Sequence, residues 1–195
     1  MAERPPHLIS YNDPEIRRLR DLNILTEVHA DEIPTENGLI LVSCSDKNRF
    51  HDIFSHLGSL CGEKIHAFAW HGGGLRLTAD SPTNETSISF DRHALAEIRD
   101  AVNVVANTTT IVLLVHLPCG KARLANMTWQ EVFSNLCASK WRLKSEFAQK
   151  VNVLTLVHIH YWDDETGDEK MRTYFLDPHR WVEDPASGWS APLAS

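Results

Sequence analysis

Two apolar segments of strand length each end in residues that bind metals. The first, residues 38–46, reads GLILVSCSD and carries Cys44 near its end. The second, residues 110–120, reads TIVLLVHLPCG and carries His116 and Cys119. Such nearly continuous apolar runs are typical of strands that are buried on both faces of a parallel sheet. Because ligands of open parallel sheets bind outside the carboxyl ends of the strands, we expect Cys44, His116 and Cys119 to meet in one cleft.

Two thiolates and one imidazole form a ligand set that favours zinc. Three protein ligands leave the fourth tetrahedral position for water or another group, as in catalytic zinc sites. Taken singly, a cysteine at a strand end is usually a small buried hydrophobic residue. Taken together, Cys44, His116 and Cys119 predict a Zn²⁺ site, with Asp46 close enough in sequence to serve as a further ligand.

These residues resemble a known signature. Cys44-Ser45-Asp46 and His116-x-x-Cys119-Gly120 are similar to the zinc motifs Cys-x-Asp-x-Arg and His-x-x-Cys-Gly of the β-class carbonic anhydrases. Other parts of the chain resemble further family segments in the same order, namely residues 67–74, 98–106 and 161–167. The resemblance covers about residues 39–176 and marks the chain as a divergent member of that group.

The resemblance implies an activity, a cofactor and an assembly. It implies reversible hydration of CO2 to bicarbonate by a zinc-bound hydroxide, in a homodimer or higher homo-oligomer. In the family, the residue matching Asp46 either binds zinc or pairs with the arginine two positions later. Here that position is Asn48, with Lys47 and Arg49 beside it. Because asparagine lacks the charged fork that holds a carboxylate, either Arg49 substitutes for the missing arginine or Asp46 stays on the metal.

Two other functions fit the same residues. One is hydrolysis of a molecule like CO2, such as carbonyl sulfide or carbon disulfide. The other is a non-catalytic or latent zinc protein in which Asp46 occupies the fourth metal position. His71, in a glycine loop, is a candidate proton shuttle, although a loop histidine without a role is more common. His158 and His160 share one face of a strand, and a structural role is favoured there over a second metal site.

Alternating strand and helix patterns predict an α/β fold with a mostly parallel central sheet flanked by helices. The resemblance adds about four parallel strands and one antiparallel edge strand, which we expect at residues 171–176. Helices are expected at residues 15–22, 48–60, 91–106 and 129–149, with Asp13, Asp91 and Thr128 as N-caps. We divide the chain into an N-terminal arm with a helix (1–37), the zinc-binding domain (38–178) and a C-terminal tail (179–195).

Composition narrows the function classes. The 195 residues are 43% hydrophobic and 23% charged, which fits one globular domain with a sizeable core. The net charge of −7 and the lack of basic clusters argue against nucleic acid as a partner. No apolar run is long enough for a signal peptide core or a membrane span, so we expect a cytoplasmic protein. In a reducing compartment, metal binding explains two of the four cysteines better than disulfides do.

Overall fold

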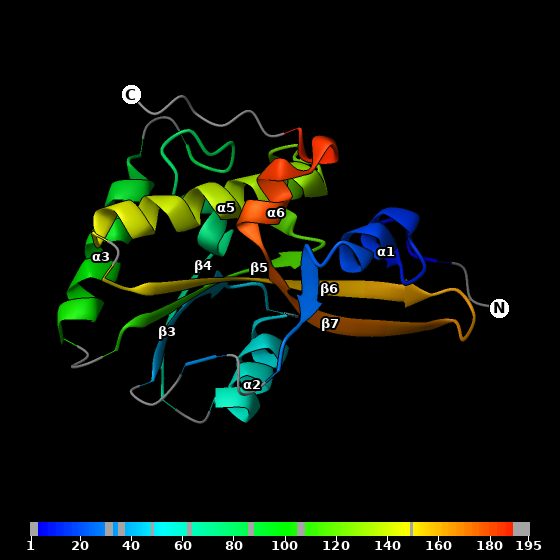
Figure 1. Ribbon diagram of the computed structural model, residues 1–195, viewed down its shortest axis with the longest axis horizontal. Coiled ribbons are helices and arrows are strands. Elements are labelled where there is room, and N and C mark those ends of the chain that lie inside the picture. The colour runs from blue at the N-terminus through cyan, green and yellow to red at the C-terminus, as the bar shows by residue number, and fades with distance from the viewer. Residues whose placement is uncertain are drawn as a thin grey trace.

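The computed structural model of the protein shows one central sheet with helices on both faces (Figure 1). In the orientation of Figure 1, α2 lies below the sheet, α5 and α6 lie above it, and α3 lies at its left end. The predicted α/β architecture is therefore confirmed. The structure describes residues 4–29, 33–34, 38–47, 49–61, 64–85, 88–104, 108–148 and 150–188.

The strand order of the sheet is β2-β7-β6-β5-β3-β4, and β1 also pairs with β6. Four strands form the parallel core and β7 runs antiparallel to β6, as expected. The core strands and β7 are β3 (Leu39–Cys44), β4 (Ile65–Trp70), β5 (Thr110–Leu117), β6 (Asn152–Asp163) and β7 (Asp168–Leu176).

Two short strands from the N-terminal arm complete the sheet. β2 (Leu25–Glu27) pairs antiparallel with the end of β7, so β7 is not the edge strand that the sequence suggested. β1 (Ile9–Ser10) pairs in parallel with β6 at a point beyond the end of β5. Strands of two or three residues are too short for a periodic pattern to reveal.

The helices begin largely where their caps predicted. The Asp13 carboxylate accepts hydrogen bonds from the first turn of α1, and Thr128 forms a capping box with Glu131 at the start of α5. Among the described helices, none is both long and apolar enough to cross a membrane. The helical segments are α1 (Pro14–Asp21), α2 (Phe50–Cys61), η2 (Gly73–Arg76), α3 (Phe90–Val104), α4 (Gly120–Leu124), α5 (Trp129–Glu146), α6 (Pro178–Glu183) and η3 (Pro185–Ser187).

One predicted cap is wrong. α3 begins at Phe90, and Asp91 lies inside its first turn, nearly buried. The Asp91 carboxylate accepts a 2.7 Å hydrogen bond from Arg142 of α5, whose guanidinium also donates to the carbonyl oxygen of Leu77. Asp91 therefore ties α3 to α5, because a buried carboxylate requires a charged partner.

The polar segment at residues 78–89, which follows η2, packs partly against the domain in its described part. Thr78, Ser81 and Thr83 are buried. The hydroxyls of Ser81 and Thr83 both donate to the carbonyl oxygen of Leu75 in η2. The hydroxyls of Ser81 and Thr83 thus satisfy the backbone of the preceding turn instead of facing solvent.

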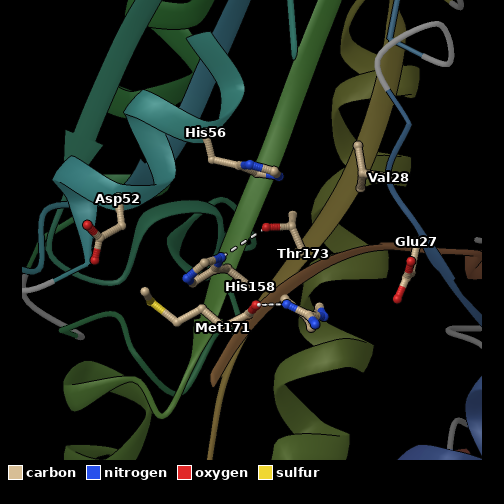
Figure 2. Close-up of a pocket in the computed structure, with 8 residues that line it drawn as sticks. Glu27, Val28, Asp52, His56, His158, Met171 and Thr173 are labelled. Carbon is tan, nitrogen blue, oxygen red and sulfur yellow. Dashed lines mark hydrogen bonds between the residues drawn. The ribbon is translucent and has the colours of Figure 1, made fainter. Parts of the chain in front are cut away.

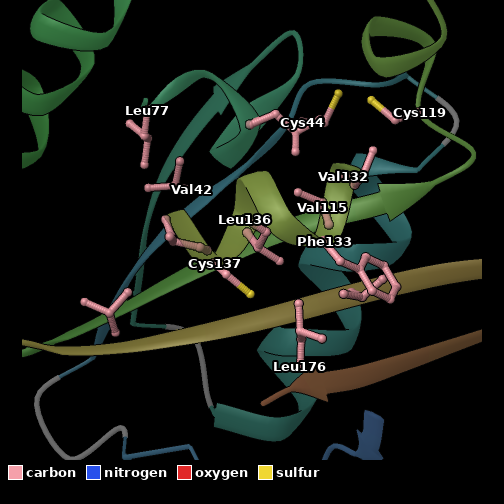
Figure 3. Packing of buried hydrophobic residues seen from close by; sticks show 14 of the residues in the cluster. Val42, Cys44, Leu77, Val115, Cys119, Val132, Phe133, Leu136, Cys137 and Leu176 are labelled. Atoms are coloured by element: carbon pink, nitrogen blue, oxygen red, sulfur yellow. The ribbon is translucent and has the colours of Figure 1, made fainter. Parts of the chain in front are cut away.

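The central strands β3 and β5 are buried on both faces, as their apolar runs predicted, whereas the edge strand β4 is partly exposed. Alternate residues of β3 enter different clusters: Ile40 and Val42 face α3 and α5, whereas Leu39 and Leu41 face α2. Figure 3 shows part of the larger cluster, in which Phe133 and Leu136 of α5 lie near residues of the sheet.

Candidate metal centre

The three predicted ligands come from the ends of two adjacent strands. Cys44 is the last residue of β3, and His116 is the second-last residue of β5. Cys119 follows β5 after Pro118 and is the N-cap residue of α4. β3 and β5 pair directly and in parallel, which brings their carboxyl ends together. The structure thus confirms that these residues share one site.

The geometry of the three side chains suits a metal ion. The two thiol sulfurs and a ring nitrogen of His116 all lie within 4.8 Å of one another. The two cysteine side chains point toward each other in Figure 3. Cys44, His116 and Cys119 are 2%, 0% and 5% exposed. Among the described residues, these three form the one group of at least three potential ligands that could hold a metal ion.

The imidazole of His116 gives an independent reason to assign a metal. Both of its ring nitrogens are buried, and neither has a hydrogen-bond partner within the described part of the chain. Buried polar atoms without partners are rare because they lose their hydration without compensation. A cation bound by one nitrogen and the two sulfurs removes much of that penalty, so this donor set fits zinc.

The pKa values of the Cys44 and Cys119 thiols shift in opposite directions. A hydrogen bond from the Cys44 thiol lowers the pKa of Cys119 to about 7, aided by the backbone N–H groups of Ala122 and Lys121. The same hydrogen bond, together with burial, raises the pKa of Cys44 to about 12. One thiolate is therefore available near neutral pH, and the remaining thiol proton is released when a cation binds.

The glycine loop after β4 packs against the ligand strand. The N–H of Gly72 donates to the Cys44 sulfur at 3.3 Å. Gly72 and Gly73 have φ angles of 98° and 51°, and a Cβ at Gly73 would lie 2.5 Å from the Cys44 nitrogen. Glycine is therefore required here by both the backbone angles and the close approach, but the sequence did not reveal that the loop approaches Cys44.

Asp46 and Arg49 lie beside the metal centre. Both line a cavity of about 210 Å³ that also contacts Cys119. The backbone oxygen of Asp46 accepts hydrogen bonds from the N–H groups of Arg49 and Phe50, which start α2. Asn48, which replaces the arginine of the family motif, lies outside the described residues.

Two further residues of this cavity were not anticipated. His7, from the segment before β1, and Arg123, from α4, line it together with Pro118. Neither belongs to a sequence motif, so nothing in the sequence pointed to them. An adjoining cavity of about 420 Å³ shares these residues and Cys119, and its other walls are mainly apolar: Ile9, Leu117, Ala122, Asn126, Met127, Thr128, Trp129 and Val132.

His71, His158 and His160 do not line either of the two cavities beside Cys119. His71 is exposed, and a role for it in proton transfer stays a prediction. His160 forms an ion pair with Glu169 at 2.7 Å. His158 lines a third cavity, of about 430 Å³, together with Asp52 and His56 (Figure 2). Burial lowers the pKa of His158 to about 3, which keeps the ring neutral.

The other two cysteines are outside the site. Cys137 is fully buried in α5, and burial raises the pKa of its thiol. Cys137 is therefore a buried structural thiol. The side chain of Cys61 lies outside the described residues.

Comparison with known proteins finds similarity to solved structures. No family model matches the chain, and no curated protein matches it either. A solved structure of the β-carbonic anhydrase CafD, from the filamentous fungus Aspergillus fumigatus, is similar to it with 15% sequence identity and a TM-score of 0.45. The similarity covers 78% of this chain and 99% of that one.

Proposed function

We propose that the chain is a zinc-dependent carbonic anhydrase that hydrates CO2 reversibly to bicarbonate. The supporting observation is the convergence of Cys44, His116 and Cys119 at the ends of paired strands, with a buried imidazole that has no other described partner. This set of three protein ligands leaves one metal position open. Zinc held by these residues would supply a hydroxide nucleophile at neutral pH, because zinc lowers the pKa of bound water to about 7.

Asp46 and Arg49 have complementary roles in this proposal. Asp46 borders the same small cavity as Cys119, where its carboxylate accepts a hydrogen bond from the nucleophile and orients it. Arg49 borders that cavity too and holds Asp46 away from the metal, in place of the arginine expected at position 48. The adjoining apolar walls, including Leu117 and Val132, exclude water from the path of CO2.

The test is stopped-flow CO2 hydration by the zinc-loaded protein across pH 6 to 9. We expect a hydration rate above that of buffer. In Arg49→Ala the rate should fall by about tenfold or more, since the Asp46 carboxylate would no longer be held. Lys47→Ala is the matched control: Lys47 is exposed on the other side of position 48, and its loss should leave the rate unchanged. No hydration above buffer with zinc bound stoichiometrically would refute the proposal.

A latent or non-catalytic zinc protein is the second candidate. The observation favouring it is Asn48 in the motif position of arginine: asparagine cannot pair with a carboxylate as a charged fork, and a metal ion attracts a nearby carboxylate such as that of Asp46, which would close the site. Asn48→Arg distinguishes the two candidates: a large gain in hydration indicates a native site closed by Asp46. An unchanged rate in a protein that is already active indicates that Arg49 performs the role.

Two finer aspects accompany the proposal. Hydrolysis of carbonyl sulfide or carbon disulfide at the same metal would release sulfide, and a sulfide assay separates it from CO2 hydration. A homodimer or larger homo-oligomer and a cytoplasmic location remain predictions, which light scattering and cell fractionation would check.

A further inference from the structure

Two buried imidazoles on neighbouring strands each have a ring nitrogen without a described hydrogen-bond partner. His116 of β5 is fully buried, and His158 of β6 is 4% exposed. Neither nitrogen of His116 has a partner among the described residues, and the same holds for Nε2 of His158. The other nitrogen of His158, Nδ1, lies 3.0 Å from the hydroxyl oxygen of Thr173.

The pairing of β5 with β6 makes these two side chains neighbours. His116 and His158 are register partners in the parallel ladder. Register partners project from the same face of a sheet, and adjacent strands lie about 4.8 Å apart. The preceding alternate residues, Leu114 on β5 and Leu156 on β6, share the hydrophobic cluster beneath α2. The two imidazoles therefore lie side by side on the α2 face.

We propose that His158 is a positioning residue for the metal ligand His116. Its Nε2 accepts the ring N–H that His116 retains when the other ring nitrogen binds the metal. This inference rests on the metal-binding part of the proposed function. It does not require that the site hydrate CO2.

The chemistry of imidazole supports this assignment. A metal-bound histidine almost always donates its second ring N–H to a nearby acceptor, which fixes the ring orientation. A neutral imidazole has one donor and one acceptor nitrogen, and the hydrogen bond at one nitrogen sets the role of the other. If Nδ1 of His158 donates to Thr173, as the contact in Figure 2 allows, Nε2 is the acceptor that His116 needs.

The resulting chain of hydrogen bonds crosses three adjacent strands. Thr173 of β7 is the register partner of His158, just as His158 is the register partner of His116. All three side chains are buried. The register of the sheet therefore sets the spacing between the candidate metal ligand His116, the acceptor His158 and the hydroxyl of Thr173. A shift of register in β6 would separate His158 from both neighbours.

His160 provides a matched control. It lies two residues further along β6 and is 3% exposed, so its burial and face match those of His158. Its register partner is Met171, and its Nε2 pairs with Glu169. The last register pair between β5 and β6 is Leu117 with Ile159, and β5 ends there. His160 therefore has no register partner on β5.

Zinc affinity, measured by competition with a chelator, is the first test. Loss of an outer-shell partner typically weakens metal binding by about 10- to 100-fold, and we expect that loss in His158→Phe. His158→Gln, whose amide oxygen can accept a hydrogen bond, should recover part of it, and His160→Phe should stay within about twofold of the wild type. His158→Phe that is folded by circular dichroism and binds zinc as tightly as the wild type would overturn the proposal.

The second test, the ring tautomer of His158, is independent of activity. Nitrogen NMR of the labelled protein, with and without zinc, should show a proton on Nδ1 and none on Nε2. Thr173→Val should disturb this preference. A proton on Nε2 in the wild type would refute the proposal whether or not the protein binds zinc. Zinc binding without CO2 hydration would refute the proposed activity, and the tautomer would still decide the role of His158.

Discussion

Replacing Gly73 with alanine should destabilise the protein and disturb the metal centre together. The φ angle of 51° at Gly73 costs an L-residue about 1–2 kcal/mol. The added Cβ would lie 2.5 Å from both the Cys44 nitrogen and the Ser43 carbonyl carbon, which belong to a buried central strand. Relieving such overlap typically costs a further 1–3 kcal/mol, about 2–5 kcal/mol in all. Relief also requires moving the backbone of Cys44, so we expect weaker zinc binding.

Urea unfolding and chelator competition would measure both effects of Gly73→Ala. Gly58→Ala is the control, because Gly58 lies in α2 and a Cβ there meets no atom of the described chain within 4 Å outside the neighbouring helix backbone. That variant should be stabilised by up to about 1 kcal/mol through helix propensity, with unchanged zinc affinity. A free energy of unfolding for Gly73→Ala within about 0.5 kcal/mol of the wild type would refute the argument, since that is the scatter of neutral surface substitutions.

Three further predictions concern the scaffold. Thr128→Ala removes the cap of α5 and should lower the free energy of unfolding by about 1 kcal/mol in urea, whereas an unchanged value would contradict the capping box. Trp181→Ala empties a fully buried site and removes the hydrogen bond to Ser134, so calorimetry should show the free energy of unfolding reduced by about 3–5 kcal/mol. A reduction below about 1 kcal/mol would show that α6 contributes little to stability. The Lys170 ammonium lowers the pKa of Asp163 from 3.8 to about 2, so this carboxylate contributes its full stabilisation above about pH 4 and loses it as the pH falls toward 2. Asp163→Asn should flatten that part of the stability curve measured by acid titration, and an unchanged acid limb would refute the role of the pair.

Local patterns in the sequence were sufficient for the central elements. The apolar runs of β3 and β5 indicated strands buried on both faces, and the structure places alternate residues of each strand in clusters on opposite sides of the sheet. The caps at Asp13 and Thr128 were also predicted, because capping depends on residues only two or three positions apart. The convergence of Cys44 with the His116 motif followed from one general rule about the ends of parallel strands.

Other features depend on contacts between segments that are distant in sequence. Gly73 approaches Cys44 and Asp91 pairs with Arg142 only because separate elements pack together. The place of β2 beside β7 is of the same kind, since three residues carry no periodic signal.

The same limit applies to the surroundings of the metal centre. His158 carries no sign in the sequence that it lies beside His116, since strand register is set by the packing of whole strands. His7 and Arg123 reach the cavity of Asp46 from the N-terminal segment and α4. The sequence by itself therefore determined the candidate metal ligands and the strands that carry them, because both depend on residue type and short-range periodicity. Only the tertiary structure decided which side chains surround those ligands, because such neighbours are set by long-range packing.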